Sequence, residues 1–156
     1  MDRDLISVFK TAFLNEVDGQ KFYEMAAECI NTPEVKEALL RLADEEKLHQ
    51  DYLKSELNRL HGQSTRDMDK SEIILPEPGI FKTDNLDFSS LDTALMVFSV
   101  GMRLEKEAEN YYRSNKEFLG GDLRLQILFD KLAQWEALHY EYFKRLYDQY
   151  GGERVV

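Results

Sequence analysis

Leu132-Ala-Gln-Trp-Glu-Ala-Leu-His139 repeats an earlier stretch of the same chain, Leu42-Ala-Asp-Glu-Glu-Lys-Leu-His49. Both stretches end in Glu-x-x-His, so each carries a carboxylate and an imidazole three positions apart. On an α-helix this separation places both side chains on one face, about one turn apart. A carboxylate and an imidazole placed in this way can hold one metal ion between them. The sequence therefore contains an internal repeat of a metal-ligand motif.

Apolar residues around the two repeats recur at alternating intervals of three and four, which is the pattern of helices with one buried face. Thr32-Pro33 is a helix start, and Gly120-Gly121 and Gly151-Gly152 are helix ends. The pattern predicts four helices, at residues 3–30, 33–60, 91–118 and 122–150.

Residues 61–90 interrupt the helical pattern and contain the turn-forming sequence Leu75-Pro-Glu-Pro-Gly79. A loop of this length is unusual in a compact domain unless it must travel along the whole domain. Some four-helix bundles contain such a connection. We therefore predict an all-α four-helix bundle with a long crossover at 61–90 between the second and third helices.

The composition sets broad limits on class and location. The chain has 156 residues and 43% hydrophobic content, so we expect one domain over residues 1–156. A net charge of −10 argues against nucleic acid and anionic membrane surfaces as partners. Cys29 is the single cysteine, which excludes an internal disulfide framework and favours a cytoplasmic location. We find no signal peptide at the N-terminus and no apolar run long enough to span a bilayer.

Each predicted helix carries an acid near the middle of its apolar stripe. Alone, one such acid is more often at the edge of the stripe, in water. Four acids packed together would repel one another and raise one another's pKa. Two divalent cations remove that repulsion and leave the imidazoles as neutral donors. The candidate metal ligands are Glu16, Glu46, His49, Glu105, Glu136 and His139.

The ligand types favour particular metals. Carboxylate and imidazole without thiolate suit iron or manganese better than structural zinc. Ferritin-like carboxylate proteins use this set, with one Glu from each of two helices and Glu-x-x-His from the other two. We expect two iron ions, with manganese as the alternative, and some carboxylates bridging them. For one isolated motif, a hydrogen-bonded core histidine would be an equal explanation; two motifs with two further acids favour the metal site.

Four further residues on these helices carry expectations. Tyr23 and Tyr112 each follow one of the single acids by seven positions, and their hydroxyls either hydrogen-bond a ligand carboxylate or are satisfied elsewhere in the core. Glu45 falls off the apolar stripe and is expected in water. Trp135 points to another face, where packing or a subunit contact is expected.

Aromatic residues surround the fourth helix on several sides, which favours a homodimer. They are Tyr140, Tyr142, Phe143, Tyr147 and Tyr150.

At these residues the chain resembles the ferritin-like superfamily and, within it, the rubrerythrin group. The matching stretches are Glu16-Val-Asp-Gly-Gln-Lys-Phe-Tyr23 and Leu42-Ala-Asp-Glu-Glu-Lys-Leu-His49, and the similarity extends over residues 3–150. The resemblance implies a non-haem di-iron centre that reduces hydrogen peroxide. Relatives in the superfamily oxidise and store iron.

The chain departs from the rubrerythrin pattern in two ways. Rubrerythrins usually carry a rubredoxin-like domain with two Cys-x-x-Cys pairs, whereas one cysteine implies an external electron donor here. The family's third helix often supplies a second acid at the position of Ala108.

Three functions follow from these features. The first is a di-iron oxidoreductase that reduces peroxide or dioxygen, and the second is a ferroxidase or iron-binding protein. The third is a helical scaffold with a structural or vestigial metal site, and substrate hydroxylation stays open.

Overall fold

The computed structural model describes residues 3–60 and 91–152 of the chain. These residues form four long α-helices and one short 3₁₀ helix, and no strand occurs among them. None of the helices in this part of the chain combines the length and the apolar character needed to cross a membrane. The elements are α1 (Arg3–Cys29), α2 (Pro33–Leu60), α3 (Leu91–Ser114), η2 (Lys116–Leu119) and α4 (Leu123–Gly152).

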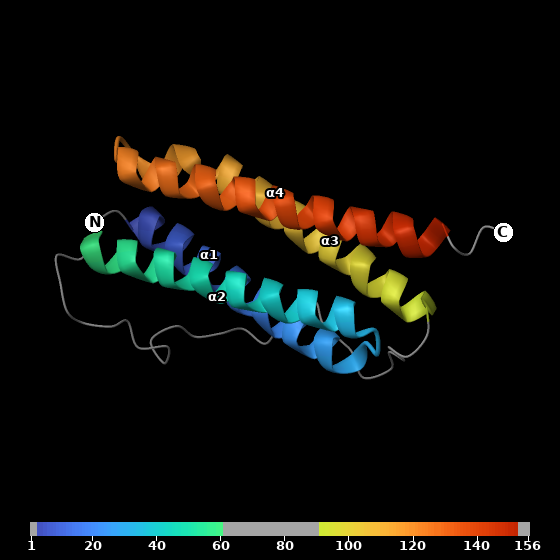
Figure 1. The fold of residues 1–156 in the computed structure, drawn as a ribbon. Coiled ribbons are helices and arrows are strands. Elements are labelled where there is room, and N and C mark those ends of the chain that lie inside the picture. Colours follow the sequence, from blue (N-terminus) through green and yellow to red (C-terminus); the bar gives the residue numbers. More distant parts are fainter. Residues whose placement is uncertain (1–2, 61–90, 153–156) are drawn as a thin grey trace.

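The helices pack as two hairpins, α1 with α2 and α3 with α4 (Figure 1). The closest backbone packing lies within each hairpin, and the two hairpins meet where α1 faces α3 and α2 faces α4. The end of α2 and the start of α3 lie at opposite ends of the bundle (Figure 1). A helix of 28 residues such as α2 is about 42 Å long. The predicted all-α four-helix bundle is confirmed, while the predicted crossover at 61–90 lies outside the described residues.

The third helix ends earlier than predicted. The periodicity predicted a helix to residue 118, but α3 stops at Ser114 and η2 follows. The side chain of Asn115 donates from Nδ2 to the carbonyl oxygen of Tyr111 at 2.9 Å, and its own N–H donates to the same oxygen. Asparagine at such a position competes with the helical hydrogen-bond pattern and favours a turn. The turn brings Leu119 into the core, where it is 3% exposed.

Helix α4 begins and ends close to the predicted residues. Asp122 caps it, because Oδ1 accepts hydrogen bonds from the N–H groups of Arg124 at 3.0 Å and Leu125 at 3.3 Å. At the other end the helix runs to Gly152, so that Gly151 lies within the last turn instead of ending the helix. Glycine weakens a helix without forbidding it, which is why the sequence located this end only approximately.

The apolar core is divided into two clusters, one toward each end of the bundle. Each large side chain that is fully buried contributes about 1.5–3 kcal/mol to folding. The first cluster includes Phe22, Tyr23, Ala26, Leu39, Phe98 and Phe143. The second cluster includes Phe9, Ala12, Leu53, Leu57, Phe129 and Leu132. The side chains between these clusters are polar and are described in the next section.

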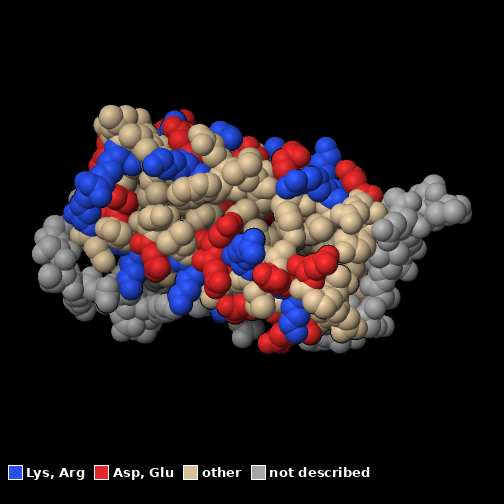
Figure 2. All heavy atoms as spheres, in the orientation of Figure 1, with Lys and Arg blue, Asp and Glu red and all other residues tan. Residues whose placement is uncertain are grey.

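The surface of the bundle is strongly charged. Figure 2 shows the face formed by α2 and α4, on which acidic and basic side chains are interspersed rather than gathered into separate fields. Some of these charges pair along or between helices, as Arg59 does with Asp122 at 3.0 Å. Exposed pairs of this kind contribute about 0–1 kcal/mol each, so the core carries most of the stability.

Replacing Gly101 with alanine should destabilise the bundle. A Cβ atom at Gly101 would lie 2.8 Å from Cε2 and 2.9 Å from Cζ of Phe143, a ring that is fully buried in the first cluster. The gain of about 1 kcal/mol in helix propensity is offset by an overpacking cost of about 1–3 kcal/mol. We expect a net loss of about 1 kcal/mol in the free energy of unfolding, measured by chemical denaturation. Gly151→Ala is the control, because its Cβ would meet Leu95 at an ordinary 3.7 Å. Equal stability of the two variants would contradict the prediction.

Candidate metal centre

The six side chains predicted as metal ligands lie together in the middle of the bundle, between the two apolar clusters. Helices α1 and α3 each supply one carboxylate, and α2 and α4 each supply a carboxylate and an imidazole one turn apart. All six are buried, with exposed fractions of 2% for Glu16, 3% for Glu46, 3% for His49, 1% for Glu105, 1% for Glu136 and 6% for His139. We call them the six-residue cluster.

The six-residue cluster consists of two overlapping groups of four. One group is Glu16, Glu46, His49 and Glu136, and the other is Glu46, Glu105, Glu136 and His139. Within each group one possible ligand atom from every residue lies within 4.8 Å of the others. Both groups contain Glu46 and Glu136, and a carboxylate with two oxygens can bridge two ions. Each group therefore has the donors and the spacing to hold one metal ion.

Burial and mutual repulsion control the ionisation of the cluster. Burial, followed by repulsion from Glu16, raises the pKa of Glu46 well above its usual value. Burial and repulsion from Glu105 raise the pKa of Glu136 in the same way. At Glu16 burial acts to raise the pKa, but hydrogen bonds with Glu46 and His49 outweigh it and lower the pKa. The metal-free cluster therefore retains protons that cations would displace.

Four buried atoms in the cluster have no hydrogen-bond partner: Glu46 Oε1, Glu105 Oε2, Glu136 Oε1 and His139 Nδ1. An unpaired buried polar group costs about 1–3 kcal/mol, and more when it is charged. The imidazoles still approach the carboxylates closely, since His49 Nδ1 lies 2.9 Å from Glu136 Oε1 and His139 Nδ1 lies 3.3 Å from Glu46 Oε1. Unpaired lone pairs that converge in one buried space are what a pair of divalent cations would satisfy, so the residues fit such a pair.

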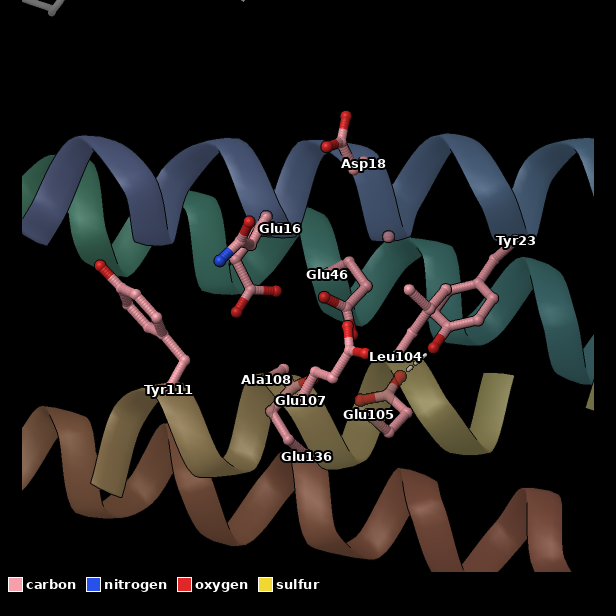
Figure 3. Close-up of a pocket in the computed structure, with 12 residues that line it drawn as sticks. Glu16, Asp18, Tyr23, Glu46, Leu104, Glu105, Glu107, Ala108, Tyr111 and Glu136 are labelled. Atoms are coloured by element: carbon pink, nitrogen blue, oxygen red, sulfur yellow. Dashed lines mark hydrogen bonds between the residues drawn. The ribbon is translucent and has the colours of Figure 1, made fainter. Parts of the chain in front are cut away.

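Two tyrosines connect the hairpins at the cluster. The Tyr23 hydroxyl donates to Glu105 Oε1 (Figure 3), and the Tyr112 hydroxyl donates to Glu16 Oε1. Both tyrosines are 1% exposed. The sequence left open whether these hydroxyls bond a ligand carboxylate or another group in the core. In the structure both bond a carboxylate of the six-residue cluster. Each tyrosine binds the acid of the opposite hairpin, although in the sequence it follows the acid of its own helix.

A pocket of about 210 Å³ reaches the carboxylates between α1 and α3. Figure 3 shows Glu16, Glu46 and Glu105 extending toward this space, with Ala108 at its wall. Gly19 also lines the pocket, and a Cβ atom there would lie 3.2 Å from Glu46 Oε2. The missing side chain at Gly19 therefore leaves room for the Glu46 carboxylate. Ala108 occupies the position at which the family that the sequence resembles often has an additional acid. The pocket wall is therefore small and apolar at this position.

On the opposite side of the cluster, Glu45 has a contact that the sequence did not predict. Glu45 was expected in water, and its side chain is 47% exposed, but its Oε2 also accepts a hydrogen bond from His139 Nε2. Burial acts to lower the pKa of His139, but the nearby carboxylates, Glu105 first and Glu45 next, outweigh it and raise the pKa to about 12. The sequence could not reveal this hydrogen bond, because the periodicity of α2 gives no information about the side chains of α4 that lie opposite.

Trp135 occupies the position in the second repeat that Glu45 occupies in the first. Its indole stacks on the His49 ring, with centroids 5.2 Å apart and planes at 12°. Trp135 also contacts the second apolar cluster. The sequence analysis expected either packing or a subunit contact for Trp135. In the structure Trp135 packs within its own chain. The sequence analysis assigned neither residue to the site; the signal that could have found them is the internal repeat, because each directly precedes the Glu of its motif.

Comparisons with known proteins agree with the fold. The family model described as Rubrerythrin matches residues 8–153. A solved structure of a hypothetical protein from Pyrococcus furiosus aligns with a TM-score of 0.73 and 20% identity, over 93% of this chain and 89% of that one. At that identity the similarity concerns the fold alone. No curated protein sequence gives a significant match.

The metal-free protein should lose stability as the pH rises from about 5 to about 8. Glu46 and Glu136 have a pKa raised above the usual 4.5, so the folded chain holds protons that the unfolded chain releases in this range. His139 acts in the same direction above its usual pKa of 6.5. The lowered pKa of Glu16 affects stability only below about 4.5, outside this range.

The measurement is the denaturation midpoint of chelator-treated protein across this pH range. In the presence of a divalent cation the trend should reverse, because ligands must lose their protons to bind metal. Metal-free protein whose stability increases between these pH values would contradict the prediction.

Proposed function

Because the chain belongs to the rubrerythrin family, we propose that the six-residue cluster holds two iron ions and reduces peroxide or dioxygen with electrons from an external donor. The observation that carries the proposal is the convergence of four unpaired buried donor atoms within two overlapping ligand groups. Carboxylate and imidazole donors without thiolate favour iron or manganese over structural zinc.

In this proposal the ligands divide according to the two groups. Glu46 and Glu136 belong to both groups, so each would help to hold both ions. Glu16 and His49 complete one group, and Glu105 and His139 complete the other. When bound, the iron pair supplies Lewis acidity and two single-electron redox steps.

The protein's own side chains prepare the site for a small oxidant. The hydroxyls of Tyr23 and Tyr112 hold Glu105 and Glu16 by hydrogen bonds, so these carboxylates keep their orientation while the pocket is filled. The pocket of about 210 Å³ leads to the carboxylates and has room for a molecule of the size of peroxide or dioxygen. The two apolar clusters close the cluster off along the bundle axis and limit the access of water.

In this proposal the electrons come from an external donor. The 156 residues contain one cysteine, so they offer no Cys-x-x-Cys pair that could hold an iron–sulfur centre. A protein or small reductant that supplies single electrons is the proposed donor. A homodimer formed through the aromatic faces of α4 and a cytoplasmic location remain predictions.

A ferroxidase that handles iron is the second candidate. Asp18 and Glu107 line the same pocket as the cluster carboxylates, and the chain carries a net charge of −10. The negative charge of these pocket residues favours the approach of ferrous ions. The two candidates differ in whether iron continues to accumulate after the cluster is filled. A purely structural metal site would need no pocket that reaches the ligands.

Metal analysis of protein purified without chelators tests the proposal first. We expect about two iron or manganese ions per chain, as the two ligand groups require. Glu46→Gln should lower this content, since Glu46 belongs to both groups, and Glu37→Gln on the exposed face of the same helix should leave it unchanged.

Anaerobic ferrous protein is then mixed with peroxide in a stopped-flow instrument. A rapid ferric absorbance with constant stoichiometry supports the oxidoreductase, and continued uptake of iron supports the ferroxidase. Protein that binds no ferrous iron, or that binds it and gives no rapid oxidation, would overturn both candidates.

Replacing Ala108 with leucine should slow oxidation without lowering metal content. Ala108 lines the pocket but belongs to neither ligand group, so a larger side chain would narrow access and leave the ligands in place. The expected effect is a decrease of several-fold in the rate of ferrous oxidation by peroxide. Ala108→Ser, which is nearly the same size as alanine, is the control. An unchanged rate in the leucine variant would show that the oxidant reaches the cluster by another path.

A further inference from the structure

The two halves of the six-residue cluster differ on the side away from the carboxylate pocket. Glu45 and Trp135 directly precede the Glu of the two repeated motifs, and each lies against the histidine of the other motif. One histidine therefore has a carboxylate partner and the other has an indole. The ligands themselves follow the repeat, whereas this pair of residues beside the histidines differs between the two halves.

Glu45 fixes the orientation of His139 and, once a metal ion displaces the proton from Nδ1, would also fix its tautomer. Its ionised carboxylate only accepts hydrogen bonds, so it holds the proton on His139 Nε2. Nδ1 then faces the cluster, 3.3 Å from Glu46 Oε1 and 3.4 Å from Glu105 Oε1. A carboxylate on the far nitrogen keeps the ring in place and makes the near nitrogen a stronger metal donor.

Trp135 restrains His49 without giving it an acceptor. Tryptophan has one N–H donor and no hydrogen-bond acceptor, so it can stack on the ring but cannot fix the proton on Nε2. The stack continues outward to Tyr52, with centroids 5.7 Å apart and planes at 25°. The two histidine rings are nearly parallel, at 12°, so the halves differ in hydrogen bonding and not in ring direction.

We propose that the half of the cluster containing Glu105 and His139 binds the first divalent cation, and binds it more tightly, because Glu45 positions His139. The half containing Glu16 and His49 is filled second. This inference rests on the proposed function only in that the cluster binds two metal ions.

Glu45 is well placed for a direct test. It lines an opening of about 360 Å³ between α2 and α4, together with Leu48, Trp135 and Leu138. Because its side chain is 47% exposed and lies outside both apolar clusters, substitutions there should leave the metal-free fold intact. The denaturation midpoint of each metal-free variant checks this.

The test is a calorimetric titration with cobalt(II), which probes the ligands without oxidation. Wild-type protein should bind about two ions per chain in two steps of different affinity, one for each ligand group. Glu45→Met removes the acceptor and should weaken the tighter step by about 10–100-fold while leaving the other step unchanged. Glu45→Gln keeps a neutral acceptor and should restore part of the loss. Glu37→Met, on the exposed face of the same helix, is the control.

Trp135→Glu tests the same inference from the other half. It gives His49 the carboxylate that His139 already has, so the weaker step should tighten and the two affinities should converge. Two equal steps in the wild type, or equal weakening of both steps in Glu45→Met, would overturn the inference and leave the proposed function in place. Absence of any binding would overturn both.

Discussion

Four carboxylates buried side by side are the constraint on which this bundle depends. Glu16, Glu46, Glu105 and Glu136 are each at most 3% exposed, and they lie where an ordinary four-helix bundle would continue its apolar core. Removing such groups from water without compensation costs several kcal/mol for each ion. The protein separates its apolar side chains into two clusters on either side of this layer, so that the clusters supply the packing energy while the layer supplies the chemistry.

The cluster is complete only when both hairpins have come together. Each ligand group takes residues from both hairpins, because Glu46 and Glu136 belong to both groups. The tyrosines strengthen this dependence, since Tyr23 binds Glu105 and Tyr112 binds Glu16 across the interface. Backbone packing is closest within the hairpins, and the two apolar clusters, which each contain side chains from both hairpins, join them on either side of the six-residue cluster. The six-residue cluster therefore forms only when the two hairpins have packed together.

The two open sides of the cluster have different chemistry. Between α1 and α3 a pocket reaches the carboxylates, with small residues such as Gly19 and Ala108 at its wall. Between α2 and α4 the histidines are backed by Glu45 and Trp135. In the proposed function a small oxidant approaches from the first side, while the second side holds the imidazoles in position. The duplicated sequence thus forms a site that is symmetric in its ligands and asymmetric in the residues that support them.

The sequence alone determined the helices, their buried faces and the six residues of the cluster. These features depend on the local period of the helix, which any stretch of about ten residues records: an acid such as Glu105 within an apolar stripe is visible without knowledge of its neighbours. Contacts between helices were decided only by the tertiary structure. The exchange of tyrosine partners between hairpins, the sharing of Glu46 and Glu136, and the bond from His139 to Glu45 depend on which helices lie opposite one another. Periodicity gives the face of a helix that is buried, but not the side chain that this face meets, because that depends on the packing of segments far apart in the chain.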